Sequence, residues 1–427
     1  MPKGTTQSTS LLDMAQKVLP AGSFGNMPAE LIIESGSGSR IWDIEGNEYI
    51  DYLLGSGPML LGHNHPEVTE AAAWQLRRGT TFFTNNPLGI ELAGMINEAV
   101  ACADMVRFVS TGSEAVAYAM RLARAYTGRD KILKFEGGFH GYSDWGLMSV
   151  EPKRHSNSSR PIPDSAGIPK AVLENIVVAP FNDIEAVERL IHEFKGTLAA
   201  VILEPQQRLI PPVPGFLQAM RDLTQAHDIL LVFDEMATGF RLTYGGAQEF
   251  YGVIPDLCTL GKVIGGGFPL AAVAGRADIM ALFDRKRVAT DRFVPMVGTF
   301  SGNPVAAAAG IATLKVLKRP GTYERFVQTG RRLMYGLAER FERAGIHVKV
   351  VGEHAMFDVV FGGDEVTNYK DLTRGDTDLV ARYNKLVGER GIHKGEAKYY
   401  VSMALTETDI KETFAIWDET VDILASG

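Results

Sequence analysis

Short apolar runs alternate with amphipathic stretches through the middle of the chain. Five runs have the length of buried strands, at 105–110, 131–136, 175–180, 199–204 and 229–234. Apolar residues recur at helical spacing over 114–126, 184–194 and 215–227. Strands that alternate with helices pair in parallel, because each helix carries the chain back across the sheet. The pattern predicts an α/β fold with a mostly parallel, doubly wound sheet.

The two ends of the chain follow other patterns. Near the N-terminus we expect a helix at 11–18, a Gly- and Pro-rich loop at 20–28, and a hairpin formed by 40–44 and 49–53. Beyond residue 320 we expect helices at 323–344, 378–390 and 407–424, and strands at 348–351 and 356–361. This predicts three parts: an N-terminal segment (1–55) that joins the small domain, a large domain (56–318) and a small C-terminal α+β domain (319–427).

Composition narrows the class of partner. The chain has 427 residues, of which 45% are hydrophobic and 22% charged, as in ordinary globular proteins with a large core. The formal net charge of -8 and a pI near 5.7 argue against a nucleic-acid surface, which would carry a basic stripe. We expect small-molecule partners and no nucleic acid.

Cysteine usage and apolar run lengths indicate the compartment. Cys102 and Cys258 lie far apart in sequence, with neither CxxC nor Cys/His ligand spacing, so we expect no disulfide framework and no metal site. No apolar run approaches the roughly 18 residues of a spanning helix, and the first residues lack a signal-peptide core. We expect a cytoplasmic protein that neither crosses nor binds a membrane.

The stretch from Ile229 to Gly267 carries the first candidate chemistry. An apolar run ends in Asp234, as in a buried strand that delivers a carboxylate where open α/β sheets place their ligands. A second apolar, glycine-rich segment delivers Lys262, and such surroundings would desolvate an amine and lower its pKa. Taken singly, Asp234 could be a helix cap and Lys262 a surface charge.

A second motif lies upstream, at Ser110-Thr-Gly-Ser-Glu-Ala-Val, between an expected strand and an expected helix. Free N–H groups at the helix start, with Gly112 allowing close approach and Ser113 offering a hydroxyl, make a phosphate seat. The alternative is a simple turn with Ser113 as helix N-cap. A P-loop around Lys262 is excluded by Asp256 and Val263, which stand where glycine and Ser or Thr are needed.

Together these motifs fit one cofactor. Pyridoxal 5'-phosphate requires a phosphate cradle, a lysine that forms a Schiff base and an acid that keeps the pyridine nitrogen protonated. The phosphate seat, Lys262 and Asp234 meet the three requirements. We therefore expect an enzyme that uses this cofactor.

The motifs resemble those of the class III (fold type I) pyridoxal-phosphate aminotransferases, and most of all the glutamate-1-semialdehyde 2,1-aminomutase branch. The resemblance runs from about Leu19 to the C-terminus. It rests on Val106-Arg-Phe-Val-Ser-Thr-Gly-Ser-Glu-Ala, Lys134-Phe-Glu-Gly-Gly-Phe-His-Gly, Val201-Ile-Leu-Glu-Pro, Val232-Phe-Asp-Glu-Met-Ala-Thr-Gly-Phe-Arg, Thr259-Leu-Gly-Lys-Val-Ile-Gly-Gly-Gly and Gly298-Thr-Phe-Ser-Gly-Asn-Pro.

The resemblance implies roles for cofactor-binding residues. Gly112 and Ser113 would hold the phosphate, and Asp234 would pair with the pyridinium. Phe139, where the family usually has tyrosine, would stack on the ring, and Met236, usually valine or isoleucine, would cover its other face.

The remaining implied residues surround the ring. His140 would support the structure, and Glu204 would belong to the network around ring and substrate, although a strand-end carboxylate is its alternative reading. Thr299 would reach the phosphate of the neighbouring subunit, which implies a homodimer with shared active sites.

The resemblance also implies a mechanism. Lys262 would form the internal aldimine, give way to a substrate amine and carry a proton between the substrate carbon and the cofactor. The cofactor would leave the first half-reaction as pyridoxamine 5'-phosphate, and a second carbonyl compound would then take up the amino group.

Departures from the aminomutase branch bear on the substrate. The loop at 20–30 lacks the arginine that grips the substrate carboxylate there, Arg208-Leu209 replaces a Gly-Asn pair, and 142–145 is bulkier than expected. The pocket could then be apolar, lined by Phe24, Phe82, Phe83, Trp145 and Arg208. Each aromatic residue could equally belong to the core or a dimer interface.

We therefore expect an aminotransferase that acts on a primary amine or amino acid with an apolar or aromatic side. Arg208, Lys394 and Lys398 are candidate carboxylate contacts, with a surface charge as the alternative for each. Other functions left open are true aminomutase activity, racemase or decarboxylase chemistry on the same scaffold, and a catalytically silent dimeric binding module.

Overall fold

The computed structural model describes residues 6–27, 31–152, 159–363 and 365–426. Its largest sheet has seven strands in the order β4-β10-β9-β8-β7-β5-β6. The strands are β4 (Met105–Val109), β5 (Lys131–Phe135), β6 (Ile176–Ala179), β7 (Leu198–Leu203), β8 (Leu230–Asp234), β9 (Leu257–Leu260) and β10 (Ala271–Gly275). All neighbours pair in parallel except β10, which is antiparallel to both β4 and β9. The expected mostly parallel sheet is confirmed.

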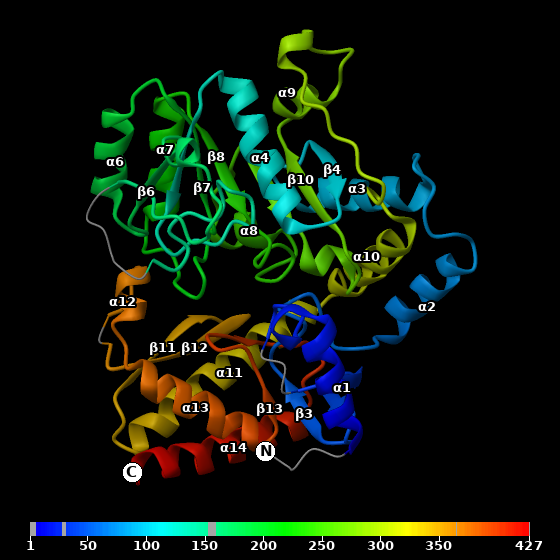
Figure 1. Ribbon diagram of the computed structural model, residues 1–427, viewed down its shortest axis with the longest axis vertical. Helices are drawn as coiled ribbons and strands as arrows, with labels where there is room; N and C mark the ends of the chain where they lie inside the picture. Colours follow the sequence, from blue (N-terminus) through cyan, green and yellow to red (C-terminus); the bar gives the residue numbers. More distant parts are fainter. Residues whose placement is uncertain (1–5, 28–30, 153–158, 364, 427) are drawn as a thin grey trace.

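Both faces of this sheet are covered, because its strands are apolar on both sides. On β8, Leu231 and Phe233 face one core cluster, with α3 (Pro87–Ala99), α6 (Ile184–Glu193), α7 (Phe216–Ala226) and α10 (Pro304–Leu317). Leu230 and Val232 face the opposite cluster, which α4 (Gly112–Thr127) covers. Figure 1 shows α4 crossing in front of the sheet. The sheet is therefore the middle layer of a three-layer α/β unit.

Two smaller sheets bring the chain ends together. One joins β1 (Ile33–Ser37), β2 (Arg40–Asp43) and β3 (Glu48–Asp51) to β13 (Ile392–His393), and the other contains β11 (Val348–Glu353), β12 (Met356–Phe361) and β14 (Tyr399–Tyr400). Ile392 pairs with Ile50 in parallel, so the N-terminal segment shares a sheet with the C-terminal part. In Figure 1 the two parts lie together below the large sheet. The division at residues 55 and 318 remains a prediction.

The remaining helices are distributed over the N-terminal segment, the large sheet unit and the C-terminal part. These are α1 (Thr6–Val18), α2 (Pro66–Leu76), α5 (Lys170–Leu173), α8 (Gly246–Tyr251), α9 (Ala277–Met280), α11 (Thr322–Arg343), α12 (Tyr369–Thr373), α13 (Thr377–Glu389) and α14 (Glu407–Ala425). The helix α2 packs along α10 and, with the loop after it, projects from the body in Figure 1. None of the helices within the described residues is long and apolar enough to cross a membrane.

The two cysteines, distant in sequence, are neighbours in the fold. Both are buried free thiols. A hydrogen bond from Cys102 and burial together raise the pKa of the Cys258 thiol. Contact between them could not be foreseen, because it depends on how the loop before β4 packs against β9.

Candidate active site

The carboxylate of Asp234 is fixed at the carboxyl end of the central strand β8. Its side chain is 3% exposed. Thr259, its Cα partner on β9, donates from Oγ1 to Oδ1 at 2.9 Å, and the Met236 backbone N–H donates to the same oxygen at 3.2 Å. The Nδ1 atom of His140 lies 2.8 Å from the other oxygen. A carboxylate has about four lone-pair sites, so it retains capacity for one more donor.

Lys262 follows the neighbouring strand β9. Because β8 and β9 are parallel, their carboxyl ends deliver Asp234 and Lys262 at the same edge of the sheet. The lysine opens a short 3-10 turn, Lys262–Gly265, with φ of 49°. A left-handed backbone at a residue other than glycine costs about 1 kcal/mol or more, and such strain is concentrated at functional sites. The fold therefore holds the backbone of the half-buried Lys262 in a left-handed conformation at this edge.

The N-terminus of α4 forms the third part. Thr111 is the N-cap: its hydroxyl accepts from the Glu114 N–H at 3.2 Å while Glu114 Oε2 accepts from the Thr111 N–H at 2.8 Å. The alternative of Ser113 as N-cap is therefore wrong. Ser113 Oγ instead accepts from the Tyr142 N–H at 3.1 Å. Because Thr111 caps the helix and Ser113 Oγ is used here as an acceptor, the hydroxyl hydrogen of Ser113 can be donated to an anion at the helix start.

The side chain of Met236 joins the three parts. A Cβ atom on Gly112 would lie 3.0 Å from Met236 Sδ, and one on Gly261 would lie 2.6 Å from it. The thioether therefore fills the space between the helix start and the residue before Lys262. A Cβ at position 261 would overlap the sulfur and one at 112 would press against it, so a side chain at either position would require the Met236 side chain to move.

A loop anchored by a buried lysine carries the aromatic residue. Lys134 is fully buried, and its Nζ donates to the carbonyls of Gly138 at 3.0 Å, Gly146 at 3.2 Å and Met148. Burial lowers the pKa of Lys134 to about 7. The loop between these carbonyls carries Phe139 and His140, so Lys134 fixes the backbone that presents them.

Glu204 and Arg208 lie around Phe139. Glu204, which is 8% exposed, accepts from the Phe139 N–H at 2.9 Å. The Phe139 ring has the Arg208 guanidinium 5.6 Å from its centroid and contacts the Tyr142 ring edge-on at 5.3 Å. Arg208 donates from Nε to the Gly137 carbonyl at 2.8 Å, so part of its guanidinium is already engaged.

Two residues from the C-terminal part, Lys398 and Tyr400, lie near this site; the sequence indicated Lys398 as a candidate carboxylate contact but gave Tyr400 no role. Tyr400, on β14, is 3% exposed, and the Arg241 guanidinium lies 5.0 Å from its ring centroid. Burial alone would raise the pKa of Tyr400, but the charges of Lys262, Lys398 and Arg241 outweigh it and lower that pKa to about 7. The buried arginine in the Gly239-Phe-Arg241 motif was the available signal.

The candidate pocket aromatics lie mostly at the surface of the single chain. Phe24 is 87% exposed, Phe82 48% and Phe83 69%. Trp145 packs against the core beside α4, where the Arg124 guanidinium lies 4.8 Å from the centroid of its ring. On α4, Arg124 is about three helical turns away from Ser113. In a single chain the three phenylalanines therefore do not form the wall of a buried pocket, and their role at the substrate remains a prediction.

Thr299 is also exposed, in the segment before α10. Its neighbourhood is tied to the loop before α3: Asn303 Nδ2 donates to the Thr80 carbonyl and Asn86 Nδ2 to the Gly302 carbonyl, both at 2.8 Å. The two loops form one surface that also contains Phe82 and Phe83.

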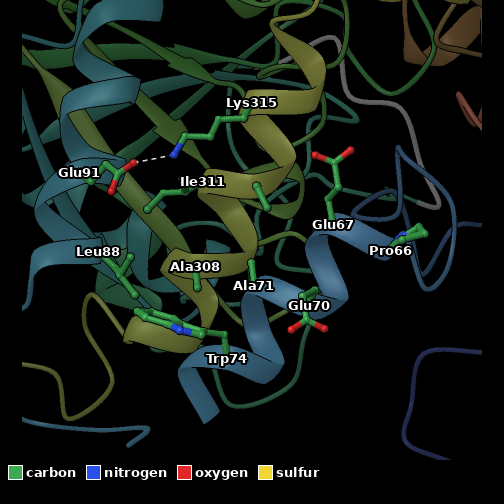
Figure 2. Close-up of a pocket in the computed structure, with 11 residues that line it drawn as sticks. Pro66, Glu67, Glu70, Ala71, Trp74, Leu88, Glu91, Ala308, Ile311 and Lys315 are labelled. Atoms are coloured by element: carbon green, nitrogen blue, oxygen red, sulfur yellow. Dashed lines mark hydrogen bonds and ion pairs between the residues drawn. The ribbon is translucent and has the colours of Figure 1, made fainter. Parts of the chain in front are cut away.

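A separate groove of about 700 Å³ lies between α2, α3 and α10 (Figure 2). Trp74 and Leu88 lie beside Ala308, and Lys315 pairs with Glu91 at 2.9 Å. None of the residues assigned to the cofactor lines this groove. It plays no part in the site around Asp234 and Lys262.

The residues at the site fit pyridoxal 5'-phosphate. The cofactor needs an amine, a carboxylate and a phosphate-binding group. Lys262, the buried Asp234 and the start of α4 with the Ser113 hydroxyl supply these three groups. The glycines at 112 and 261 leave the space beside Met236 that a side chain would fill.

Comparison with known proteins gives the family. The model of class III aminotransferases matches residues 22–391. An omega-transaminase from Sphaerobacter thermophilus is 33% identical, with 100% of this chain and 99% of that chain covered and a TM-score of 0.93. A β-phenylalanine aminotransferase from Variovorax paradoxus is 29% identical, with 98% and 94% covered and a TM-score of 0.87.

A glutamate-1-semialdehyde aminomutase from Pseudomonas aeruginosa is 24% identical, with 98% of this chain and 94% of that chain covered and a TM-score of 0.87. At that identity the likeness shows the fold alone. The family match covers most of the chain and agrees with the cofactor chemistry of the site. The chain belongs to the class III aminotransferases, enzymes of fold type I that use pyridoxal 5'-phosphate.

Proposed function

We propose that this aminotransferase transfers the amino group of a primary amine or amino acid with an apolar or aromatic side, and that Asp234, Lys262 and the N-terminus of α4 form its active site. The observation that carries the proposal is the convergence on one sheet edge of a buried carboxylate, an amine and a helix start, joined by Met236. The names of the omega-transaminase and the β-phenylalanine aminotransferase support this substrate range.

When bound, the cofactor supplies an electron sink for the bond that breaks at the substrate carbon. Lys262 Nζ is the general base that takes the proton from that carbon and the acid that returns it. Asp234 holds a proton on the pyridine nitrogen, and His140 and Thr259 orient the Asp234 carboxylate. Ser113 and the first N–H groups of α4 bind the phosphate. Phe139 and Met236 would cover the cofactor ring and exclude water from it.

A half-reaction tests this proposal. Purified protein is titrated with single amines and amino acids without a carbonyl acceptor, and the visible absorption of the cofactor is followed. We expect conversion to the pyridoxamine form with apolar or aromatic donors, and loss of that conversion in Lys262→Ala. Turnover by Lys262→Ala would refute the assignment, and absence of any spectral change with every donor would favour a silent binding module.

Aminomutase activity is the second candidate, favoured by the motif resemblance and by the fold of the Pseudomonas protein. The loop that carries the carboxylate-binding arginine in that branch reads Pro20-Ala-Gly-Ser-Phe-Gly-Asn-Met here, which weakens this candidate. Glutamate-1-semialdehyde with no added keto acid separates the two: rearrangement would establish the aminomutase. Racemase or decarboxylase chemistry would appear in the same incubation as inversion or carbon dioxide release.

We propose that the protein is a homodimer with shared active sites. In a single chain Phe82, Phe83 and Phe300 are 48%, 69% and 54% exposed on the joined loops around Thr299, and a contiguous apolar surface of this kind supports an interface. Phe83→Asp with Phe300→Asp should give monomers in sedimentation. Tyr335→Asp, at an equally exposed aromatic on α11, is the matched control and should leave the mass unchanged.

Mixed dimers test whether Thr299 acts on the partner's phosphate. A dimer of one Lys262→Ala chain and one Thr299→Ala chain would keep one complete site, because the intact lysine and the intact threonine meet in it. We expect activity above that of either parent dimer. Activity no higher than the mean of the parents would show that Thr299 acts within its own chain.

The free state of Cys102 and Cys258 supports our expectation of a reducing compartment, the cytoplasm. Fractionation of cells that express the protein is the direct test. Recovery outside the cytosolic fraction would contradict it.

A further inference from the structure

A lysine without a direct ion pair in the described residues, Lys398, lies near Lys262. Lys398 is half-buried and projects from the short turn before β14, where Gly395 and Lys398 form a bridge. Its charge is close enough to interact with Tyr400, Glu204, Lys262 and Arg208. Within the residues that the structure describes, neither a carboxylate nor a carbonyl accepts a hydrogen bond from Lys398 Nζ.

The other cations near the site are already engaged. Lys394, four residues earlier, is buried and pairs with Asp358 at 2.8 Å and with Asn384 at 2.7 Å, so it is neither a surface charge nor a free contact. Arg208 donates to the Gly137 carbonyl and lies 3.5 Å from Glu151. Of the three cations considered as carboxylate contacts, Lys398 is the one that keeps all its donors.

A second buried donor lies close by without an acceptor. The Arg241 side chain is fully buried, and its Nε and Nη2 atoms donate to the carbonyls of Ala237 and Gly57, but Nη1 has no partner in the described part of the chain. Burial lowers the pKa of Arg241 to about 10. Tyr400 lies between this guanidinium and Lys398, with ring centroid distances of 5.0 and 5.7 Å.

The local charge balance therefore favours an anion. The cations that act on Lys398 or Tyr400 are Lys262, Arg208 and Arg241, and the one carboxylate among these neighbours is that of Glu204, which the Phe139 N–H already holds. Burying an ammonium group is costly, and no carboxylate of the described residues forms an ion pair with Lys398, so an anion that paired with it would gain both Coulomb energy and a charge-assisted hydrogen bond. The helix start at Ser113 provides for the phosphate separately, which leaves Lys398 for a different anion.

We propose that Lys398 binds the carboxylate of the substrate, with the Tyr400 hydroxyl beside it, so that the preferred donors are amino acids rather than simple amines. This proposal rests on the active site around Lys262 proposed above. It assigns to β14 of the C-terminal part the role that an arginine in the loop at 20–30 would have filled. An aromatic or apolar amino acid would then direct its carboxylate to Lys398 and its amine to Lys262.

The test compares amino acids with their own carboxamides, which keep size and amine but lose the charge. In Lys398→Met, kcat/KM for the acids relative to the amides should fall about 10- to 100-fold, the loss expected for a charge-assisted hydrogen bond. Lys398→Arg should recover most of that ratio. Lys385→Met, an exposed lysine of α13, is the matched control and should keep the wild-type ratio.

A binding measurement tests the role of Lys398 without any turnover of substrate. Calorimetric titration of the holoenzyme with 3-phenylpropanoate and 3-phenylpropanamide should show tighter binding of the acid, and Lys398→Met should remove the difference. Equal loss of acid and amide in both assays would overturn the role of Lys398 while leaving the aminotransferase intact. Failure of the wild-type half-reaction with every donor would instead overturn the proposed function itself.

Discussion

Replacement of the buried Lys134 by methionine gives the most demanding test of how the site is held. The substitution keeps the length of the side chain and removes the donors to the carbonyls of Gly138, Gly146 and Met148. Each buried acceptor left without a partner costs about 1–3 kcal/mol, and relief from burying an amine offsets part of this loss. Lys134→Met should therefore lower the free energy of unfolding by about 2–5 kcal/mol at neutral pH.

The pH dependence is the sharper signature. Burial lowers the pKa of Lys134 from 10.5 to about 7 in the folded chain. Between these values the unfolded chain binds the extra proton, so wild-type stability gains up to about 1.4 kcal/mol per pH unit as pH rises. Below about pH 7 the amine is charged in both states and the gain ends. The methionine variant lacks this contribution, so its deficit should grow as pH rises above 7.

Urea unfolding followed by tryptophan fluorescence at about pH 6, 7 and 8.5 measures this deficit, because the other groups titrate alike in both proteins. Lys385→Met is again the exposed control, with no pH-dependent deficit expected. A deficit that stays constant from pH 6 to about 8.5 would refute the argument, since it would mean that the carbonyls keep the buried amine charged throughout.

Three further predictions concern the cofactor contacts. Gly261→Ala should weaken cofactor binding by about 1–3 kcal/mol, because the added Cβ overlaps the Met236 sulfur. Met236→Ala in the same chain should recover most of this loss. An absorption titration of the cofactor measures both, and lack of recovery would contradict the overlap. Thr259→Val should cost about fivefold in kcat, because one hydrogen bond to Asp234 is lost; an effect confined to KM would be inconsistent with that role. As pH is raised, the first step in tyrosinate absorbance should have its midpoint near pH 7, and Tyr400→Phe should lack this step. A first midpoint near pH 10 would contradict the influence of the neighbouring cations on the pKa of Tyr400.

Much of the site could be predicted because its residues end apolar runs. Asp234 and Lys262 each follow a strand of the same sheet, and sequence order alone brings the ends of such strands together. The predicted strands and helices agree with the observed ones to within about two residues at most ends. Antiparallel β10 was not expected, since its short run of alanines and one valine carries a weak strand signal.

The sequence indicated Lys398 as a candidate carboxylate contact but could not distinguish it from a surface charge, and it gave Tyr400 no role. The place of Lys398 depends on how β14 pairs with β12 and how that sheet lies against the large one, which no local pattern encodes. Lys134 was hidden for another reason: a lysine at a strand position reads as an edge or surface charge until its three carbonyl partners are seen.

The antiparallel strand β10 also dictates when the active site can form during synthesis. Strand β4, which leads into the helix start at Gly112, reaches the rest of the sheet only through β10, and β10 is made more than 160 residues later. Until Gly275 has left the ribosome, β4 has no neighbouring strand, so the turn at Gly112 is held only through the packing of α4 on β7, β8 and β9. Long-range pairing of this kind is slow and leaves apolar edges open meanwhile. The edge of the large sheet that leads into Gly112 is therefore completed later in synthesis than the parallel core formed by β5 to β9.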